Sequence, residues 1–212
     1  MKRSILLAIL ATTMLVGAAS ASAHNAHVTP ARGGGMTGGQ LLGEAWAQGL
    51  SGQSAPFSGT CSTVAGNVLV SHYTDDTARC TATPASRLLV FFGSFCSVAE
   101  NPLLTTEREQ LACAISSDEA IDDLTVTVDR GRAIDIHKRR FELFSPQRSV
   151  RLPADNDFGL PAGDTTFTAH AWGAVVEGLR PGRHTVVLQL VAPDFGGTYT
   201  FTTILDIAHA GH

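Results

Sequence analysis

The sequence predicts a mainly β protein, an antiparallel β-sandwich or jelly roll with a short helical insertion. Short apolar or alternating segments recur along most of the chain, and turns containing Gly or Pro separate them. A single stretch, residues 106–124, has helix-start signals instead. Many short strands with one helical excursion are typical of sandwiches and jelly rolls.

The first 23 residues have the composition of a secretory signal peptide. Lys2 and Arg3 give a positive start, Ile5–Val16 is an almost unbroken apolar run, and the small residues 21–23 close the segment. This three-part pattern is typical of a cleaved signal, and the apolar run is too short for a membrane span. We therefore expect a secreted protein, extracellular or periplasmic, without a membrane span.

Residues 24–45 are predicted to form a flexible Gly-rich leader. Residues 24–40 are polar and contain Gly33–Gly35 and Gly38–Gly39. Such a composition buries too little apolar surface to offset the entropy of ordering. The β-sandwich domain is then expected over 46–208, followed by a tail at 209–212.

Nine segments of this domain are predicted strands, because each is an apolar run or alternates between apolar and polar residues. They are 68–72, 88–92, 124–128, 134–137, 141–144, 149–152, 167–176, 184–191 and 199–207. The run 88–92 is apolar throughout, which predicts a strand buried on both faces. Residues 129–132 lie between two alternating segments and predict a hairpin turn.

The helical insertion begins with a capping box. Thr106 and Glu109 have the required spacing, and apolar residues follow at Leu111 and Ile115. Residues 116–119 offer a second helix start, running towards Leu124.

Four cysteines lie outside the predicted signal peptide, at Cys61, Cys80, Cys96 and Cys113. In an oxidising compartment they predict two disulfides, for which three pairings exist. We favour Cys61–Cys80 and Cys96–Cys113, since each closes a short loop and would add roughly 3 kcal/mol of stability. A zinc site is disfavoured because no two of them have C-x-x-C spacing.

Four ordered segments share motifs with known proteins. They are residues 79–84 continuing into 88–97, residues 111–114, residues 152–163 and residues 179–186. Over roughly residues 57–207, this set resembles a family of uncharacterised secreted bacterial proteins with an N-terminal signal peptide. The resemblance implies a secreted, disulfide-bearing β-sandwich and implies no activity. This chain departs from the family at two places: members usually have an aspartate-glycine pair before an aromatic residue where residues 170–172 stand, and often an acidic residue where Arg183 stands.

The charge balance limits the partners. Removing Lys2 and Arg3 with the signal changes the formal net charge from −4 to about −6. Nucleic acids and anionic membranes prefer a basic face, so we expect neither as a partner. One basic cluster is present in the sequence, at 137–140 with Arg130 and Arg132 nearby. Such a cluster suits an acidic glycan or an extracellular protein, or it is simply a solvated edge strand.

Three histidines are candidate metal ligands. Cleavage after Ala23 would make His24 the first residue, and its α-amine and ring nitrogen would suit Cu(II). Cleavage after Ala21 would instead place His24 third, where a histidine forms the square-planar amino-terminal copper and nickel motif. His170 and His184 flank one predicted hairpin and could approach each other across it. Apart from copper, we expect no cofactor. Residues 155–157 lie in a proline-bounded loop, where an Asx turn is favoured over a Ca²⁺ loop because Thr166 occupies the place of the required glutamate.

No catalytic residue is assigned from the sequence. The chain has no Gly-x-Ser-x-Gly elbow and no phosphate-binding loop. Glu100, Glu142 and Glu177 could supply a carboxylate pair of the glycosidase kind. We therefore hold two hypotheses: a non-enzymatic secreted binding or structural module, and a copper-dependent or carbohydrate-active protein that uses histidines or carboxylates.

Overall fold

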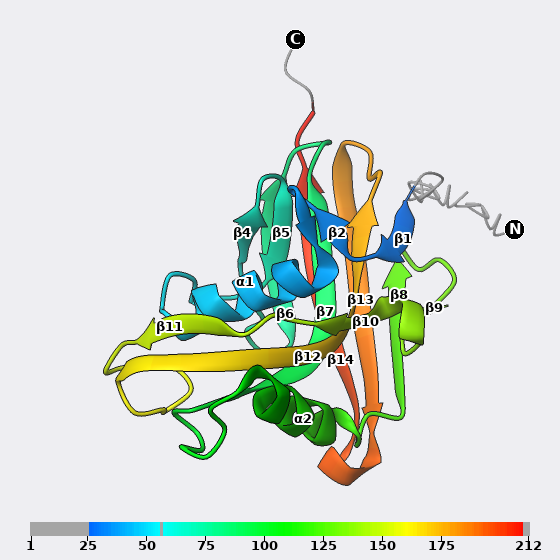
Figure 1. The fold of residues 1–212 in the computed structure, drawn as a ribbon. Helices are drawn as coiled ribbons and strands as arrows, with labels where there is room; N and C mark the ends of the chain where they lie inside the picture. Colours follow the sequence, from blue (N-terminus) through cyan, green and yellow to red (C-terminus); the bar gives the residue numbers. More distant parts are fainter. Residues whose placement is uncertain (1–25, 56, 210–212) are drawn as a thin grey trace, which may run out of the picture.

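Two β-sheets form most of the computed structural model, which describes residues 26–55 and 57–209 (Figure 1). The strands of the larger sheet are β1 (His27–Pro30), β4 (Cys61–Ala65), β5 (Val68–Ser71), β7 (Arg87–Ser97), β10 (Glu142–Phe144), β11 (Arg148–Leu152) and β12 (Gly163–Glu177). Their order is β1-β12-β7-β5-β4, and β10 and β11 pair with the rest of β12.

The second sheet has the order β6-β14-β13-β8-β9. Its strands are β6 (Thr77–Ala82), β8 (Asp123–Val128), β9 (Ile134–Asp135), β13 (Gly182–Ala192) and β14 (Gly197–Ile207). A small hairpin, two helices and two 3₁₀ turns complete the described chain: β2 (Arg32–Gly33), β3 (Met36–Thr37), α1 (Gly38–Leu50), α2 (Glu107–Asp118), η1 (Arg139–Phe141) and η2 (Pro193–Phe195). The predicted mainly β class with a short helical insertion is confirmed.

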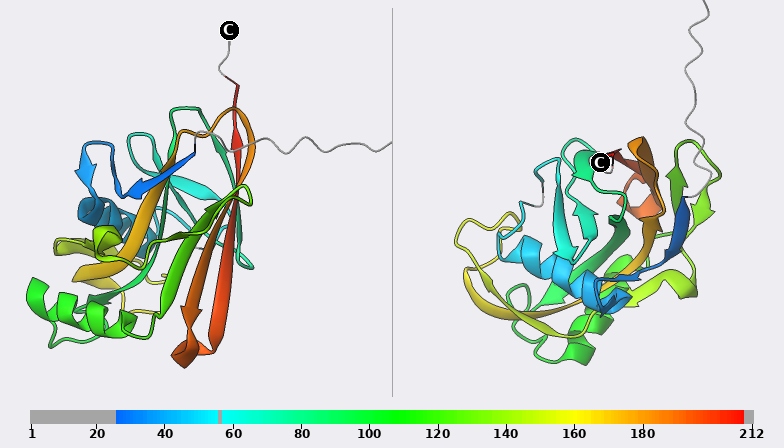
Figure 2. Two further views of the ribbon diagram at one scale, coloured as in Figure 1. Left: turned by 90° about the vertical axis from the view of Figure 1, so that its right-hand side faces the viewer. Right: turned by 90° about the horizontal axis from the view of Figure 1, so that it is seen from above.

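The molecule has layers, with the larger sheet in the middle (Figure 2). On β7, Leu88 and Val90 pack into the core shared with the second sheet, whereas Leu89 packs into a second core beneath α1. Alternate residues of a strand point to opposite faces. Leu88–Val90 are therefore buried on both faces of the sheet, as the sequence predicted, whereas Phe91 and Phe92 are only partly buried.

Two strand pairs are parallel, which the antiparallel expectation did not include. β5 pairs with β7 and β6 pairs with β14 in parallel. The sequence also gave no signal for β1, β4 and β6. These strands are short or lie at a sheet edge, so their burial comes from neighbours that are distant in sequence.

The prediction of a flexible leader over 24–45 is wrong for its described part. β1 pairs with β12, and α1 begins at the capping residue Thr37, whose side chain accepts from the Gln40 amide. The glycines permit close packing: a Cβ added at Gly39 would lie 2.0 Å from the carbonyl oxygen of Phe144. Leu41, Leu42 and Ala45 then bury one face of α1 against the sheet.

The helical insertion is a single helix. The capping box of Thr106 and Glu109 is present as predicted. The second start predicted at 116–119 is wrong, because α2 continues to Asp118 and β8 begins at Asp123. The last turn of α2 instead directs Asp118 towards the sheet.

The favoured disulfide pairing is confirmed. Cys61–Cys80 joins β4 of the larger sheet to β6 of the second sheet, and Cys96–Cys113 joins β7 to α2. Both bonds cross-link layers that share no continuous backbone hydrogen bonding.

Some predictions fall outside the described residues. They are the signal peptide at 1–23, His24, and the tail beyond His209. Within residues 26–55 and 57–209, no helix has the length and apolar character to cross a membrane.

Candidate functional site

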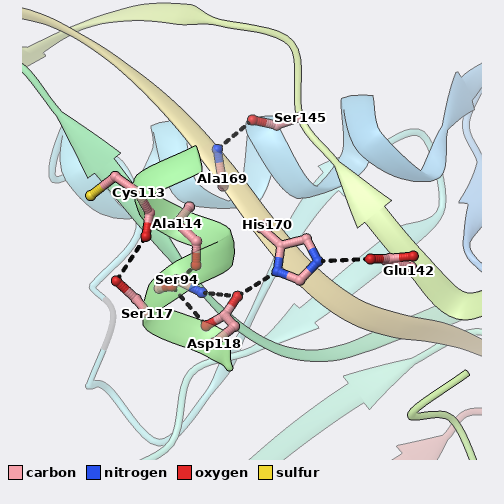
Figure 3. Close-up of polar contacts among 9 residues, drawn as sticks. All are labelled: Ser94, Cys113, Ala114, Ser117, Asp118, Glu142, Ser145, Ala169 and His170. Carbon is pink, nitrogen blue, oxygen red and sulfur yellow. Dashed lines mark hydrogen bonds and ion pairs between the residues drawn. The ribbon is translucent and has the colours of Figure 1, made fainter. Parts of the chain in front are cut away.

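His170 lies at the centre of a buried polar cluster (Figure 3). Its Nδ1 is 2.7 Å from Oδ2 of Asp118, at the end of α2, and its Nε2 is 3.4 Å from Oε1 of Glu142 on β10. The rings of Trp172 and Phe144 lie 4.7 and 5.3 Å from the imidazole. Side chains from three separate elements thus converge on one histidine.

The hydrogen-bonding capacity of this cluster is used within it. Ser94 of β7 donates its hydroxyl to Oδ1 of Asp118 at 2.7 Å and its amide to Oδ2 at 3.2 Å. The neighbouring Ser145 accepts from the Ala169 amide and is no nucleophile for His170. His170 is 1% exposed and Asp118 3% exposed. The arrangement fastens α2 to β7, β12 and β10, and it leaves little access for a substrate.

His184 lies in a separate environment. It belongs to β13 of the second sheet, with Nδ1 2.6 Å from Oδ2 of Asp129 and Nε2 2.8 Å from the carbonyl oxygen of Arg180. The same carboxylate accepts from the Thr185 amide. The expected approach of His170 and His184 across a hairpin does not occur, because β12 and β13 belong to different sheets.

The structure adds no evidence for a metal site in the part of the chain that it describes. Among the residues that the structure describes, no group of three or more His, Cys, Asp or Glu side chains is arranged to hold a metal ion. The copper hypothesis at His24 concerns a residue outside this part of the chain.

The three candidate carboxylates each contact a different partner. Glu100 accepts from the amide and hydroxyl of Ser97, Glu142 faces His170, and Glu177 forms an ion pair with Arg87. Burial raises the pKa of Glu100, and its hydrogen bonds to Ser97 oppose this shift. No glycosidase-like pair is assembled by these three residues.

The predicted basic run borders a hollow of about 600 Å³. Arg132, Lys138 and Arg140 line it, together with Ala26, the first described residue. Lys138 is already paired with Asp135 at 2.9 Å. The predicted turn at 129–132 is present, with Asp129 and Arg130 at positive φ, and β9 forms the edge of its sheet.

A smaller cavity of about 250 Å³ has a different character, because its walls are largely aromatic. It lies along β7 where β5 has ended: the parallel pairing stops at Val70 and Leu89, and Val90–Gly93 continue along the cavity. The space that a longer β5 would fill is bordered by α1 and by three loops, which carry Phe57, Tyr73 and Phe158. We refer to it as the aromatic cavity. Its aromatic wall residues are Trp46, Phe57, Tyr73, Phe91, Phe92 and Phe158.

The loop that carries Phe158 is fixed by an Asx turn, as the sequence predicted. The side-chain amide of Asn156 donates to the carbonyl oxygens of Pro153 and Leu160 at 2.9 and 2.7 Å, and its Oδ1 accepts from the Leu160 amide. Phe158 lies 6.0 Å from Trp46, centroid to centroid. The polar loop therefore serves to hold an aromatic wall in place.

The hydroxyl and imidazole groups at the aromatic cavity are engaged with neighbours. Ser71 and Tyr73 both bond to the Thr203 hydroxyl, at 2.8 and 3.1 Å. Burial raises the pKa of Tyr73, and it lowers the pKa of His72. His72 Nε2 lies 2.8 Å from the Ser62 hydroxyl. At neutral pH the cavity walls are therefore uncharged.

The contact between Ser62 and His72 has the distance of a nucleophile and its base. Such a pair needs a third group that orients the imidazole. Across the described residues, no carboxylate contacts the His72 ring, and the Ser62 hydroxyl also lies 3.5 Å from Oε1 of Gln48. We assign this pair to packing between β4 and the start of the loop that follows β5.

The sequence analysis missed the aromatic cavity because its roof, α1, was placed in the flexible leader. One signal was present: Leu41, Leu42, Ala45 and Trp46 have the i, i+1, i+4, i+5 spacing of a buried helix face.

Comparisons with known proteins add little. No protein-family model matches this chain, and no curated protein does. Among solved structures, the chain is similar to the solution structure of Amebosin, with 11% identity over 66% of this chain and 95% of that one. The TM-score is 0.24, a value too low to support an argument about fold or function.

Proposed function

We propose that this protein is an exported, non-enzymatic binding module that takes up a small apolar ligand containing an aromatic ring. The observation that carries the proposal is the aromatic cavity, a space of about 250 Å³ with six aromatic side chains in its walls. Small-molecule sites are typically concave, mostly apolar and preformed, with a few polar groups.

The size and the chemistry of the cavity agree with such a ligand. An engineered apolar cavity of about 150 Å³ accommodates benzene, so 250 Å³ suits a single ring with a short chain. The lining is mainly apolar, with Ser71, His72 and Tyr73 as its polar members, which suits an uncharged ring.

Export is the second part of the proposal. Two disulfides, Cys61–Cys80 and Cys96–Cys113, leave no free cysteine among the described residues. Such bonds persist in oxidising compartments and are rare in the cytosol. The composition of residues 1–23 and the resemblance to secreted bacterial proteins support the same location.

The binding proposal is tested with 4-phenylbutan-1-ol, an uncharged ring with a short chain. We expect calorimetry to give a Kd of about 0.1 mM, in line with the efficiency of small ligands. Ala45 of α1 lines the aromatic cavity. The variant Ala45→Leu adds side-chain volume there and should weaken binding at least tenfold.

Ala85→Leu is the matched control, since it adds the same atoms at an exposed position outside the cavity. It should leave the affinity unchanged. Equal affinity for the wild type and Ala45→Leu would place the ligand elsewhere and overturn the proposal, as would the absence of binding by the disulfide-intact wild type.

A further inference from the structure

We propose that the natural ligand is an amphiphilic cation, with an apolar aromatic body and a positively charged amine head. This inference rests on the proposed function, and it adds the charge and orientation of the ligand. It comes from a second hollow that continues the aromatic cavity.

The second hollow has a volume of about 320 Å³ and shares three wall residues with the aromatic cavity: Phe57, Ser71 and Tyr73. Its remaining lining residues are Asp75, Asp76 and Phe201. Phe57 is 63% exposed, which places it where the two spaces open to solvent. Because they share these residues, the two hollows adjoin, and we treat them as one groove with an aromatic end and an acidic end.

The acidic end carries two unneutralised carboxylates. Asp75 and Asp76 occupy a tight turn closed by the bridge between Thr74 and Thr77, and both have positive φ. In the described part of the chain, neither carboxylate takes part in an ion pair, and no Lys or Arg lines either hollow. An anionic head group would meet like charge here, whereas a cation would be attracted.

Aromatic faces stand between the two ends. Tyr73 and Phe201 lie 5.2 Å apart, centroid to centroid, and Phe92 stacks on Phe201 at 5.9 Å. A cation near an aromatic face is attracted by the ring quadrupole, and this attraction adds to that of a carboxylate. A groove with aromatic side chains at one end and carboxylates at the other therefore matches a ligand with a ring at one end and an ammonium group at the other.

The depth of the groove sets the order of the ligand groups. His72 borders the aromatic end, and burial lowers its pKa. At neutral pH this end therefore offers no charged side chain to pair with a charged ligand group. Asp75 and Asp76 line the second hollow, which shares Phe57 and Tyr73 with the aromatic cavity. The aromatic body would enter first, and the ammonium group would remain near the surface.

Three matched probes test this inference: 4-phenylbutylamine as the cation, 4-phenylbutan-1-ol as the neutral analogue and 4-phenylbutanoate as the anion. At low ionic strength and pH 7.5, we expect the amine to bind about fivefold more tightly than the alcohol, and the carboxylate to bind more weakly than the alcohol. Added salt should reduce the preference for the amine, because partly exposed charges are screened.

The double variant Asp75→Asn, Asp76→Asn removes the charge and keeps a residue type that tolerates positive φ. It should abolish the preference for the amine and leave the affinity for the alcohol unchanged. Asp122→Asn, Asp123→Asn is the matched control, because it removes two charges from consecutive exposed residues that line neither hollow; it should keep the preference.

The outcomes separate the two proposals. If the alcohol binds and the amine binds no better, or if the double variant retains the preference, the cation inference is wrong and the apolar site stands. If none of the three probes binds, the proposed function fails and the inference fails with it.

Discussion

The His170 cluster and the aromatic cavity differ in what they offer a ligand. The cluster has reactive side chains, with an imidazole between Asp118 and Glu142, but His170 is 1% exposed. The aromatic cavity has space, about 250 Å³, but its hydroxyls and its imidazole are hydrogen-bonded to neighbours.

This difference separates stability from binding. Buried polar groups that bond to one another fix the relative positions of secondary structure elements, since breaking them leaves unpaired groups in a low dielectric. Apolar walls around an unfilled space contribute less to packing than a filled core would. We therefore expect the cluster to control folding and the cavity to control ligand affinity.

The largest effect is expected from breaking the cluster. Asp118→Ala removes the partner of Nδ1 of His170 and the carboxylate that accepts from the Ser94 amide, while the Ser94 hydroxyl keeps the Ala114 carbonyl oxygen at 3.1 Å. The free energy of unfolding, measured in urea, should fall by about 3–5 kcal/mol. The affinity of the folded fraction for 4-phenylbutan-1-ol should not change.

The control for this variant is Glu119→Ala, at the exposed residue that follows in the chain. It should change the free energy of unfolding by less than about 0.5 kcal/mol. A similar small loss for Asp118→Ala would show that the cluster is not a structural fastening.

Removing a disulfide should have an intermediate effect on the free energy of unfolding, and only one of the two should also affect ligand binding. Replacing either pair with serines should lower the free energy of unfolding by about 3 kcal/mol, because both loops have similar lengths. Cys61–Cys80 joins the two sheets beside the groove, with Sγ of Cys61 3.6 Å from the Ser71 hydroxyl. Its loss should also weaken ligand binding.

Cys96–Cys113 fastens α2 and should affect stability alone. Chemical denaturation and calorimetry on both double variants test this contrast. Equal ligand affinities in the two variants would contradict the expectation that the Cys61–Cys80 bond supports the groove through the contact of Cys61 with Ser71.

The smallest effect concerns pH and His72. Burial lowers its pKa below the ordinary value of 6.5, so the native state binds fewer protons than the unfolded state as the pH falls. The stability contribution is present above pH 6.5 and is lost progressively below it. Ligand binding should weaken over the same range, because a charged imidazole would border an apolar space.

His72→Gln isolates this effect from the other histidines. Unfolding free energies and probe affinities at pH 7.5 and 5.5 should change less in the variant than in the wild type. An identical pH response in both proteins would assign the dependence to another group.

Local patterns predicted much of the fold. The capping box at Thr106 and Glu109, the Asx turn around Asn156 and the turn at 129–132 depend on neighbouring residues, and all are present. The pairing of Cys61 with Cys80 followed from the short loop that it closes. The alternating strands were located for the same reason, because the side chains of a strand alternate between its faces.

Predictions based on composition were less successful. Glycine-rich residues suggested a flexible leader, whereas Gly39 lets α1 pack against the backbone at Phe144. A glycine permits both flexibility and close approach, and its surroundings decide between them. The second helix start at 116–119 failed similarly, since the same polar residues complete one helix and supply Asp118.

The sequence by itself determined the mainly β class, the start of α2 and the two sulfur pairs, because these depend on spacing along the chain. Tertiary structure alone decided that His170 meets Asp118 and Glu142, and that Trp46, Tyr73 and Asp75 border one groove. The physical reason is that β5 ends before β7 does, and the space beside β7 exists only once α1 and the loops have folded over it.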